Sequence, residues 1–91
     1  MESLRYQVVF LDRVIAEDFP FIPTSGLSLI KRSIEKRLSV APLHYGLPLA
    51  GNLHGLRRLR VSDYRVIYRV EENLHLVTIE AMGFRKTIYD Q

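Results

Sequence analysis

The sequence predicts a single α+β domain spanning residues 1–91, in which two amino-terminal helices pack on a twisted antiparallel sheet. Three observations predict this class. Apolar residues alternate with polar ones near the amino terminus and again in the carboxy-terminal half, as in half-buried strands. Between these regions they recur every three or four positions, as on an amphipathic helix. The 91 residues, 47% hydrophobic and 25% charged, also have the size and composition of one folded domain. We therefore expect the element order β-α-α-β-β-β, followed by an extended tail.

The first strand is expected at Leu4–Leu11, where large apolar side chains occupy every second position. Residues Arg13–Phe19 can form two helical turns. Asp12 can cap these turns, and Pro20 ends them because proline cannot continue a helix.

The second helix is expected after Pro23, and Thr24 or Ser25 can cap its first turn. Its apolar stripe has helical spacing and consists of Leu27, Ile30, Ile34 and Leu38. Pro42 ends this helix. Glycines and prolines then mark a long connection as far as Gly55, and a connection of this length in a small domain is often functional.

Three further strands are expected to form an antiparallel meander. They lie at Leu56–Val61, Tyr64–Glu71 and Leu74–Met82, and an extended tail follows at Arg85–Tyr89. Two-residue hairpin loops are expected at Ser62-Asp63 and Glu72-Asn73, although the first lacks the glycine that such loops favour.

The two loops fix which residues lie opposite one another, and opposite residues share a face of the sheet. They place Arg60 opposite Arg65, Val66 opposite Ile79, and Arg65 opposite Glu80. One face then collects a coherent core: Leu59, Val61, Val66, Tyr68, Val70, Val77 and Ile79.

The other face of the meander is basic. It carries Arg58, Arg60 and Arg65, and we expect Glu80 to orient Arg65 through a cross-strand ion pair. Two arginines directly opposite each other cost a sheet stability, so their presence indicates that a polyanion binds there. Arg57 falls on the core side, and we assign it no role.

Composition excludes several kinds of site. The chain has no cysteine, so disulfides, thiolate metal sites and a cysteine nucleophile are excluded. The histidines have no metal-ligand spacing, and we expect no metal or other cofactor. His75 is expected to be structural. No apolar run is long enough to span a membrane and no export signal begins the chain, so a cytoplasmic location is expected.

Several motifs resemble those of a known family. In order they are Pro48-Leu49-Ala50-Gly51, Leu56-Arg57-Arg58-Leu59-Arg60-Val61, Asp63-Tyr64-Arg65-Val66-Ile67-Tyr68, Gly83-Phe84-Arg85 and Tyr89. Together they resemble the RelE/ParE toxins of type II toxin–antitoxin systems throughout the carboxy-terminal half, and the strand-helix-helix order before them also fits. The chain departs from the family at Ser62, where many members carry glycine, and in its short first helix, which Pro20 interrupts.

The resemblance implies a toxin that a cognate antitoxin holds inactive in a heteromeric complex. In the RelE branch the toxin enters the ribosomal A site and cleaves mRNA without a metal. The 2′-hydroxyl attacks the neighbouring phosphate, which leaves a cyclic phosphate and a 5′-hydroxyl end. The residues that match the branch's cleavage residues are Arg58, Arg60, Arg65, Arg85 and Tyr89.

The chemistry suggests a role for each of these residues. Arg65 and Arg85 would stabilise the extra negative charge of the phosphorane. Tyr89 would accept the 2′-proton, because nearby arginines favour its phenolate. Arg58 and Arg60 would hold the RNA backbone, and His54, in the loop before the arginine-rich strand, is a further candidate RNA contact.

A second function is open to the same family. In the ParE branch the toxin is a non-enzymatic inhibitor of DNA gyrase, and both branches share the Tyr64-Arg65 motif. The complete basic set together with Tyr89 favours the ribonuclease.

Overall fold

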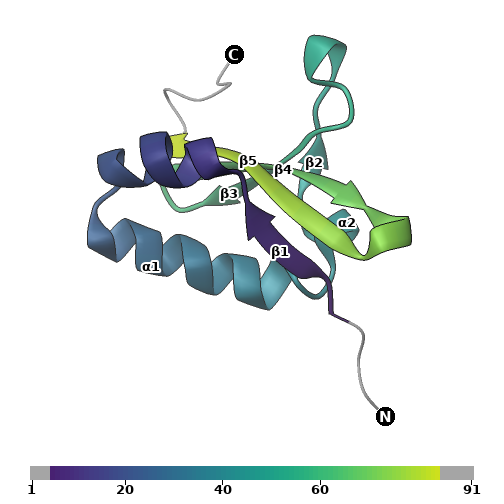
Figure 1. Cartoon of the computed structure of the whole chain (residues 1–91), viewed down its shortest axis with the longest axis horizontal. Helices are drawn as coiled ribbons and strands as arrows, with labels where there is room; N and C mark the ends of the chain where they lie inside the picture. Colours follow the sequence, from purple (N-terminus) through teal and green to yellow (C-terminus); the bar gives the residue numbers. More distant parts are fainter. Residues whose placement is uncertain (1–4, 85–91) are drawn as a thin grey trace.

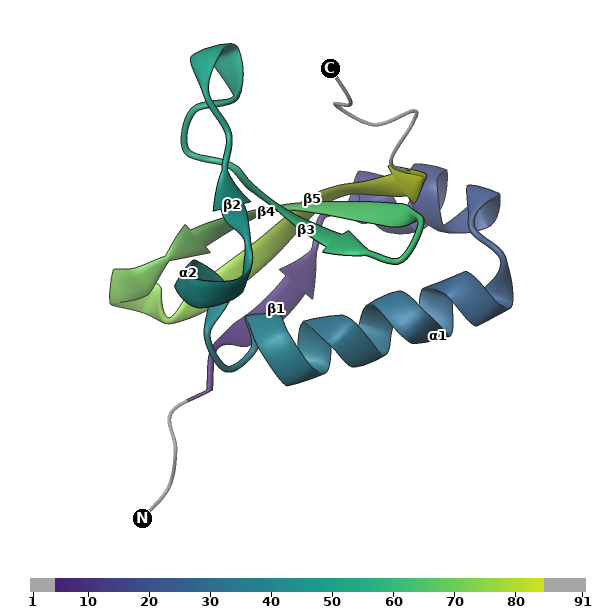
Figure 2. The ribbon, with the colours of Figure 1, turned by 180° about the vertical axis from the view of Figure 1, so that it is seen from behind.

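The computed structural model describes residues 5–84, and it contains one five-stranded sheet with the strand order β1-β5-β4-β3-β2. Helix α1 runs along one face of this sheet (Figure 1; Figure 2). The predicted α+β class, with helices packed on a sheet, is confirmed. The strands are β1 (Gln7–Phe10), β2 (Leu47–Pro48), β3 (Arg57–Val61), β4 (Tyr64–Glu71) and β5 (Leu76–Phe84), and the α-helices are α1 (Thr24–Ser33) and α2 (Pro42–Tyr45).

The sheet is antiparallel except at β1, which pairs in parallel with β5, Val8 lying opposite Val77. The expected sheet was wholly antiparallel. The helical segments carry the chain across one face of the sheet, and the β3-β4-β5 meander then returns it to β1 (Figure 1). The last strand consequently runs in the same direction as the first.

The segment after β1 forms the predicted short helix, as a π-helical turn at Val14–Asp18 and a 3₁₀ turn at Phe19–Phe21. Beyond the end of β1, this segment lies against the edge of β5 and its side chains bond to the β5 backbone. The Met82 N–H donates to the Asp18 carboxylate at 2.9 Å, and the Arg13 guanidinium donates to the Glu80 carbonyl at 2.8 Å. Side chains therefore satisfy backbone groups that a longer β1 would have paired.

The predicted apolar stripe of the second helix is confirmed, since Ile30, Ile34 and Leu38 are buried and Leu27 packs against them. A π-helical turn at Ile34–Leu38 continues α1. The predicted caps are wrong. Pro23 is the N-cap of α1, Arg13 is the N-cap of the earlier π-helical turn, and neither makes a capping side-chain hydrogen bond.

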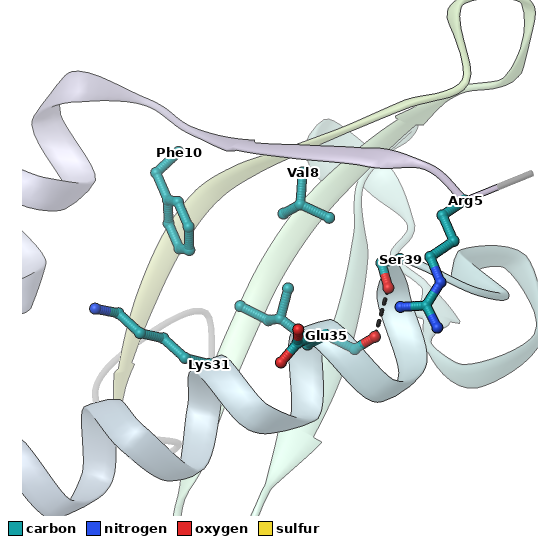
Figure 3. Close-up of a pocket in the computed structure, with 7 residues that line it drawn as sticks. Arg5, Val8, Phe10, Lys31, Glu35 and Ser39 are labelled. Carbon is teal, nitrogen blue, oxygen red and sulfur yellow. Dashed lines mark hydrogen bonds between the residues drawn. The ribbon is translucent and has the colours of Figure 1, made fainter.

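A groove of about 340 Å³ separates β1 from α1 (Figure 3). Val8 and Phe10 point from β1 toward the helix, and Lys31 lies at the same end of the groove as Phe10. At the other end the Ser39 hydroxyl donates to the Glu35 carbonyl, which closes the last turn of the helix. The apolar residues of β1 thus complete the core between helix and sheet.

The β3–β4 register is as predicted at every position, including Arg60 opposite Arg65 and Leu59 opposite Val66. The loop between the strands is the expected Ser62-Asp63 pair. Ser62 adopts a left-handed φ of 54°, which explains how the chain turns without a glycine.

Ser62→Gly is expected to stabilise the fold by about 0.5–1 kcal/mol, because glycine adopts this φ without the Cβ clash that serine carries. The same change at Ser28, an exposed position within α1, should instead destabilise by about 0.5 kcal/mol through lower helix propensity. The urea midpoints of the two variants check this. A Ser62→Gly variant less stable than the parent would contradict the assignment of strain to this turn.

The predicted β4–β5 register is wrong. The connection has four residues, 72–75, rather than two, and His75 closes it with a φ of 53°. A bulge between Ile67 and Tyr68 shifts the register again, so that Val66 lies opposite Met82 and Arg65 opposite Gly83. The seven predicted core residues still share one face, because the longer loop shifts the pairing by two residues and the bulge brings Met82 into the core.

Candidate nucleic-acid interface

Arginines gather on the sheet face opposite α1. Arg58 and Arg60 of β3 lie beside Arg65 and Arg69 of β4, and we call these four residues the arginine face. Arg60 is exposed and the other three are half-buried. The Arg60–Arg65 pair places two cations opposite each other on neighbouring strands, a like-charge contact that a bound anion would relieve.

A small apolar cluster occupies the same face of the sheet. Ile67 and Ala81 are buried there with Leu56, and Leu49 and Leu53 pack against them. These leucines come from the long connection before β3, which the Leu49 N–H closes by donating to the Leu56 carbonyl at 2.9 Å. The connection rises from the sheet beyond β2 (Figure 2). Its leucines therefore cover the apolar residues that share this face with the arginines.

Glu80 pairs with Arg69 and not, as predicted, with Arg65. The Arg69 Nε donates to the Glu80 carboxylate at 3.2 Å. The four-residue loop and the bulge in β5 are together the reason, because they leave Gly83 rather than Glu80 opposite Arg65. A carboxylate thus offsets the charge of Arg69, whereas none of the described residues forms an ion pair with Arg58 or Arg60.

Arg57 has a structural role that the sequence did not reveal. Its guanidinium donates to the carbonyls of Leu43 at 3.1 Å and Gly46 at 2.7 Å. Its cross-strand partner Tyr68 is fully buried and donates its hydroxyl to the Pro42 carbonyl at 2.7 Å. Burial raises the pKa of Tyr68, more than the neighbouring Arg57 lowers it, so the hydroxyl stays a neutral donor.

These bonds fix α2 and the residues after it against the core side of β3. The long connection therefore starts from a rigid base. One feature of the sequence could have revealed this role: the predicted register places Arg57 on the core face. A buried cation needs carbonyl or carboxylate partners, so its position there predicts such bonds.

The two other residues of interest are histidines. His54 is exposed and lines a pocket of about 230 Å³ together with Leu43, Leu49 and Leu56, and none of the four arginines of the arginine face lines this pocket. His75 stacks on Tyr6 with ring centroids 3.8 Å apart, in keeping with the structural role expected for it.

Arg85 and Tyr89, the remaining predicted catalytic residues, lie outside the described residues. The described chain ends in β5 at Phe84, whose partner on β4 is Tyr64, next to Arg65. Across residues 5–84 no group of three acidic, histidine or cysteine side chains could hold a metal ion. Over the same range no helix is long and apolar enough to cross a bilayer.

Residues 28–89 match the family described as the ParE toxin of the type II toxin–antitoxin system parDE. The chain belongs to the ParE toxin family. The RelE/ParE resemblance seen in the sequence is thereby confirmed, and the match includes the four arginines and the one tyrosine proposed for cleavage.

Solved structures of related toxins agree. The toxin–antitoxin complex RelBE2 from Mycobacterium tuberculosis contains a chain with a TM-score of 0.84 and 27% identity, covering 92% of this chain and 95% of that chain. The RelE–RelB complex from Pyrococcus horikoshii gives a TM-score of 0.69 at 24% identity, covering 90% and 97%. The isolated Escherichia coli RelE toxin gives 0.70 at 15% identity, covering 87% and 83%. At such identities the last two show the fold alone. No curated protein matches the sequence.

Proposed function

We propose that this toxin is a metal-independent, ribosome-dependent endoribonuclease that cleaves mRNA in the ribosomal A site and so stops translation in the cytoplasm. The observation that carries the proposal is the pairing of Arg60 with Arg65, with Arg58 on the same face of the sheet. Three guanidinium groups from two adjacent strands can contact successive phosphates of a single RNA strand.

Cleavage in this proposal needs no cofactor. The 2′-hydroxyl attacks the adjacent phosphate, and Tyr89 accepts its proton. The phosphorane gains negative charge, which Arg65 and Arg85 stabilise. The bond to the 5′-oxygen then breaks, which leaves a cyclic phosphate, and the 5′-oxygen takes a proton from water to become a 5′-hydroxyl. Arg58 and Arg60 hold the RNA backbone on either side.

We further propose that a cognate antitoxin neutralises the toxin by binding it. The chain of 27% identity comes from a toxin–antitoxin complex, which supports a protein partner of this kind. The family description favours one alternative function, since it names ParE: the toxin would then inhibit DNA gyrase without any cleavage.

Expression of the toxin alone is expected to halt growth, and co-expression of a cognate antitoxin is expected to restore it. Ribosomes isolated from the arrested cells should carry mRNA cut within the A-site codon, with 5′-hydroxyl ends. Gyrase supercoiling activity, assayed with purified toxin, should be unchanged. Intact mRNA together with inhibited gyrase would replace the ribonuclease with the ParE-type function, and normal growth at confirmed expression would refute both.

A further inference from the structure

A basic cleft lies beside the arginine face, between the helix layer and the outer edge of β3. Its volume is about 420 Å³, and its lining consists of Leu29, Ser33, Arg37, Arg60, Val61 and Ser62. This lining holds two guanidinium groups and two hydroxyls but no carboxylate. Such a set of donors suits a phosphate group, which accepts hydrogen bonds and carries negative charge.

The fold explains why the cleft is open. Strand β2 pairs only with Arg57 and Arg58, so the rest of the outer β3 edge has no paired strand among residues 5–84. On the opposite wall Leu29, Ser33 and Arg37 follow one another at intervals of four residues along one side of α1 and its π-helical extension.

An aromatic ring packs against the Arg37 guanidinium. Its guanidinium carbon lies 5.8 Å from the ring centroid of Tyr45, the last residue of α2. The Tyr45 ring is in turn packed edge-to-face with His44, at 4.9 Å between centroids. A cation placed over an aromatic face keeps its donors available at the ring's edge, so Tyr45 acts as a positioning residue for Arg37.

Arg60 belongs to both surfaces. It lies opposite Arg65 on the sheet and also lines the cleft with Arg37. A single strand bound across the arginine face could therefore reach the cleft by passing around the edge of β3. We propose that this cleft is a second phosphate subsite, in which Arg37 and Arg60 bind a phosphodiester of the RNA strand that flanks the cleaved bond. The identity of the ligand as RNA rests on the proposed function.

The test measures binding rather than cleavage, with a single-stranded RNA oligonucleotide made uncleavable by 2′-O-methyl groups. Arg37→Ala should weaken binding about tenfold at low salt. It should also reduce the slope of log affinity against log salt concentration by about 0.7, as expected for one lost contact to a single strand. Arg32→Ala is the matched control, because Arg32 is an exposed arginine of α1 that does not line the cleft. It should leave the slope unchanged.

Tyr45→Ala separates positioning from charge. It removes the ring and keeps the cation, so it should weaken binding less than Arg37→Ala and leave the salt slope at the parent value. Equal slopes for Arg37→Ala and Arg32→Ala, with both variants folded by circular dichroism, would overturn the subsite. So would a parent protein that does not bind the oligonucleotide. The proposed ribonuclease activity is tested separately, since intact mRNA on the ribosome would refute it without affecting the binding result.

Discussion

Arg65→Ala is expected to lower cleavage of ribosome-bound mRNA by roughly 10²–10³-fold, the usual loss when one preorganised donor to a transition-state charge is removed. The fold should survive, since Arg65 lies on the face opposite α1 and its removal relieves the repulsion with Arg60. The single-turnover cleavage rate on programmed ribosomes is the measurement, with thermal unfolding as the check on folding.

Arg69→Ala is the matched control. Arg69 lies on the same strand and the same face, but its guanidinium is paired with Glu80, so its loss should leave the rate within a few-fold of the parent. Equal losses for the two variants would mean that the whole face acts as a general cation surface and that Arg65 has no special part in the reaction.

The same assay tests the two residues beyond Phe84. Arg85→Ala should lose activity to the same extent as Arg65→Ala. Tyr89→Phe should still bind RNA but cleave slowly, because only the hydroxyl proposed to accept the proton is gone. A Tyr89→Phe variant that cleaves at the parent rate would refute the general-base assignment and leave the arginine assignments standing.

Gly46→Ala is expected to destabilise the fold by about 3 kcal/mol or more. A Cβ at Gly46 would overlap the Tyr68 hydroxyl and lie 2.9 Å from the Arg58 carbonyl, so the substitution must move the sheet or break the buried bond from Tyr68 to Pro42. Overpacking of a core costs about 1–3 kcal/mol, and a lost buried hydrogen bond adds about 1–3 kcal/mol. Urea denaturation gives the free energy of unfolding.

Two comparisons make this result specific. Gly51→Ala places a Cβ in open space at a φ of 67°, so it should cost only the left-handed conformation, about 1 kcal/mol. Tyr68→Phe removes the hydroxyl that the new Cβ would meet. If that clash is the cause, Gly46→Ala should cost clearly less in the Tyr68→Phe background than in the parent. Additive losses would place the strain at the Tyr68 ring carbon Cζ, 2.8 Å from the new Cβ, or at the Arg58 carbonyl instead.

The sequence predicted the strand pairing best where a short loop allows only one register. A two-residue loop leaves one pairing of β3 with β4 that buries the apolar set, so Arg60 and Arg65 were correctly placed opposite each other. The β4–β5 pairing depended on a four-residue loop and a bulge. Neither has a glycine or proline to mark it, and the partner of Glu80 was predicted wrongly as a result.

The features that sequence reasoning missed depend on contacts between distant segments. The bonds from Arg57 and Tyr68 to the carbonyls of residues 42–46 follow from how α2 meets the sheet. The short strand β2 and helix α2 were expected to be part of an irregular connection, because two and four residues are too few for a periodic pattern. The cleft at Arg37 likewise needs the packing of α1 against the β3 edge.

The parallel pairing of β1 with β5 also has a consequence for the order of folding. Helix α1 and the β3–β4 hairpin join neighbouring parts of the chain and can form as soon as they are made. Strand β1 finds its partner only after β5 has been synthesised, so the earliest-made strand is among the last to be locked in place. During translation Val8 and Phe10 remain without the sheet they belong to, and the hydrophobic core closes only when almost all of the described chain has left the ribosome.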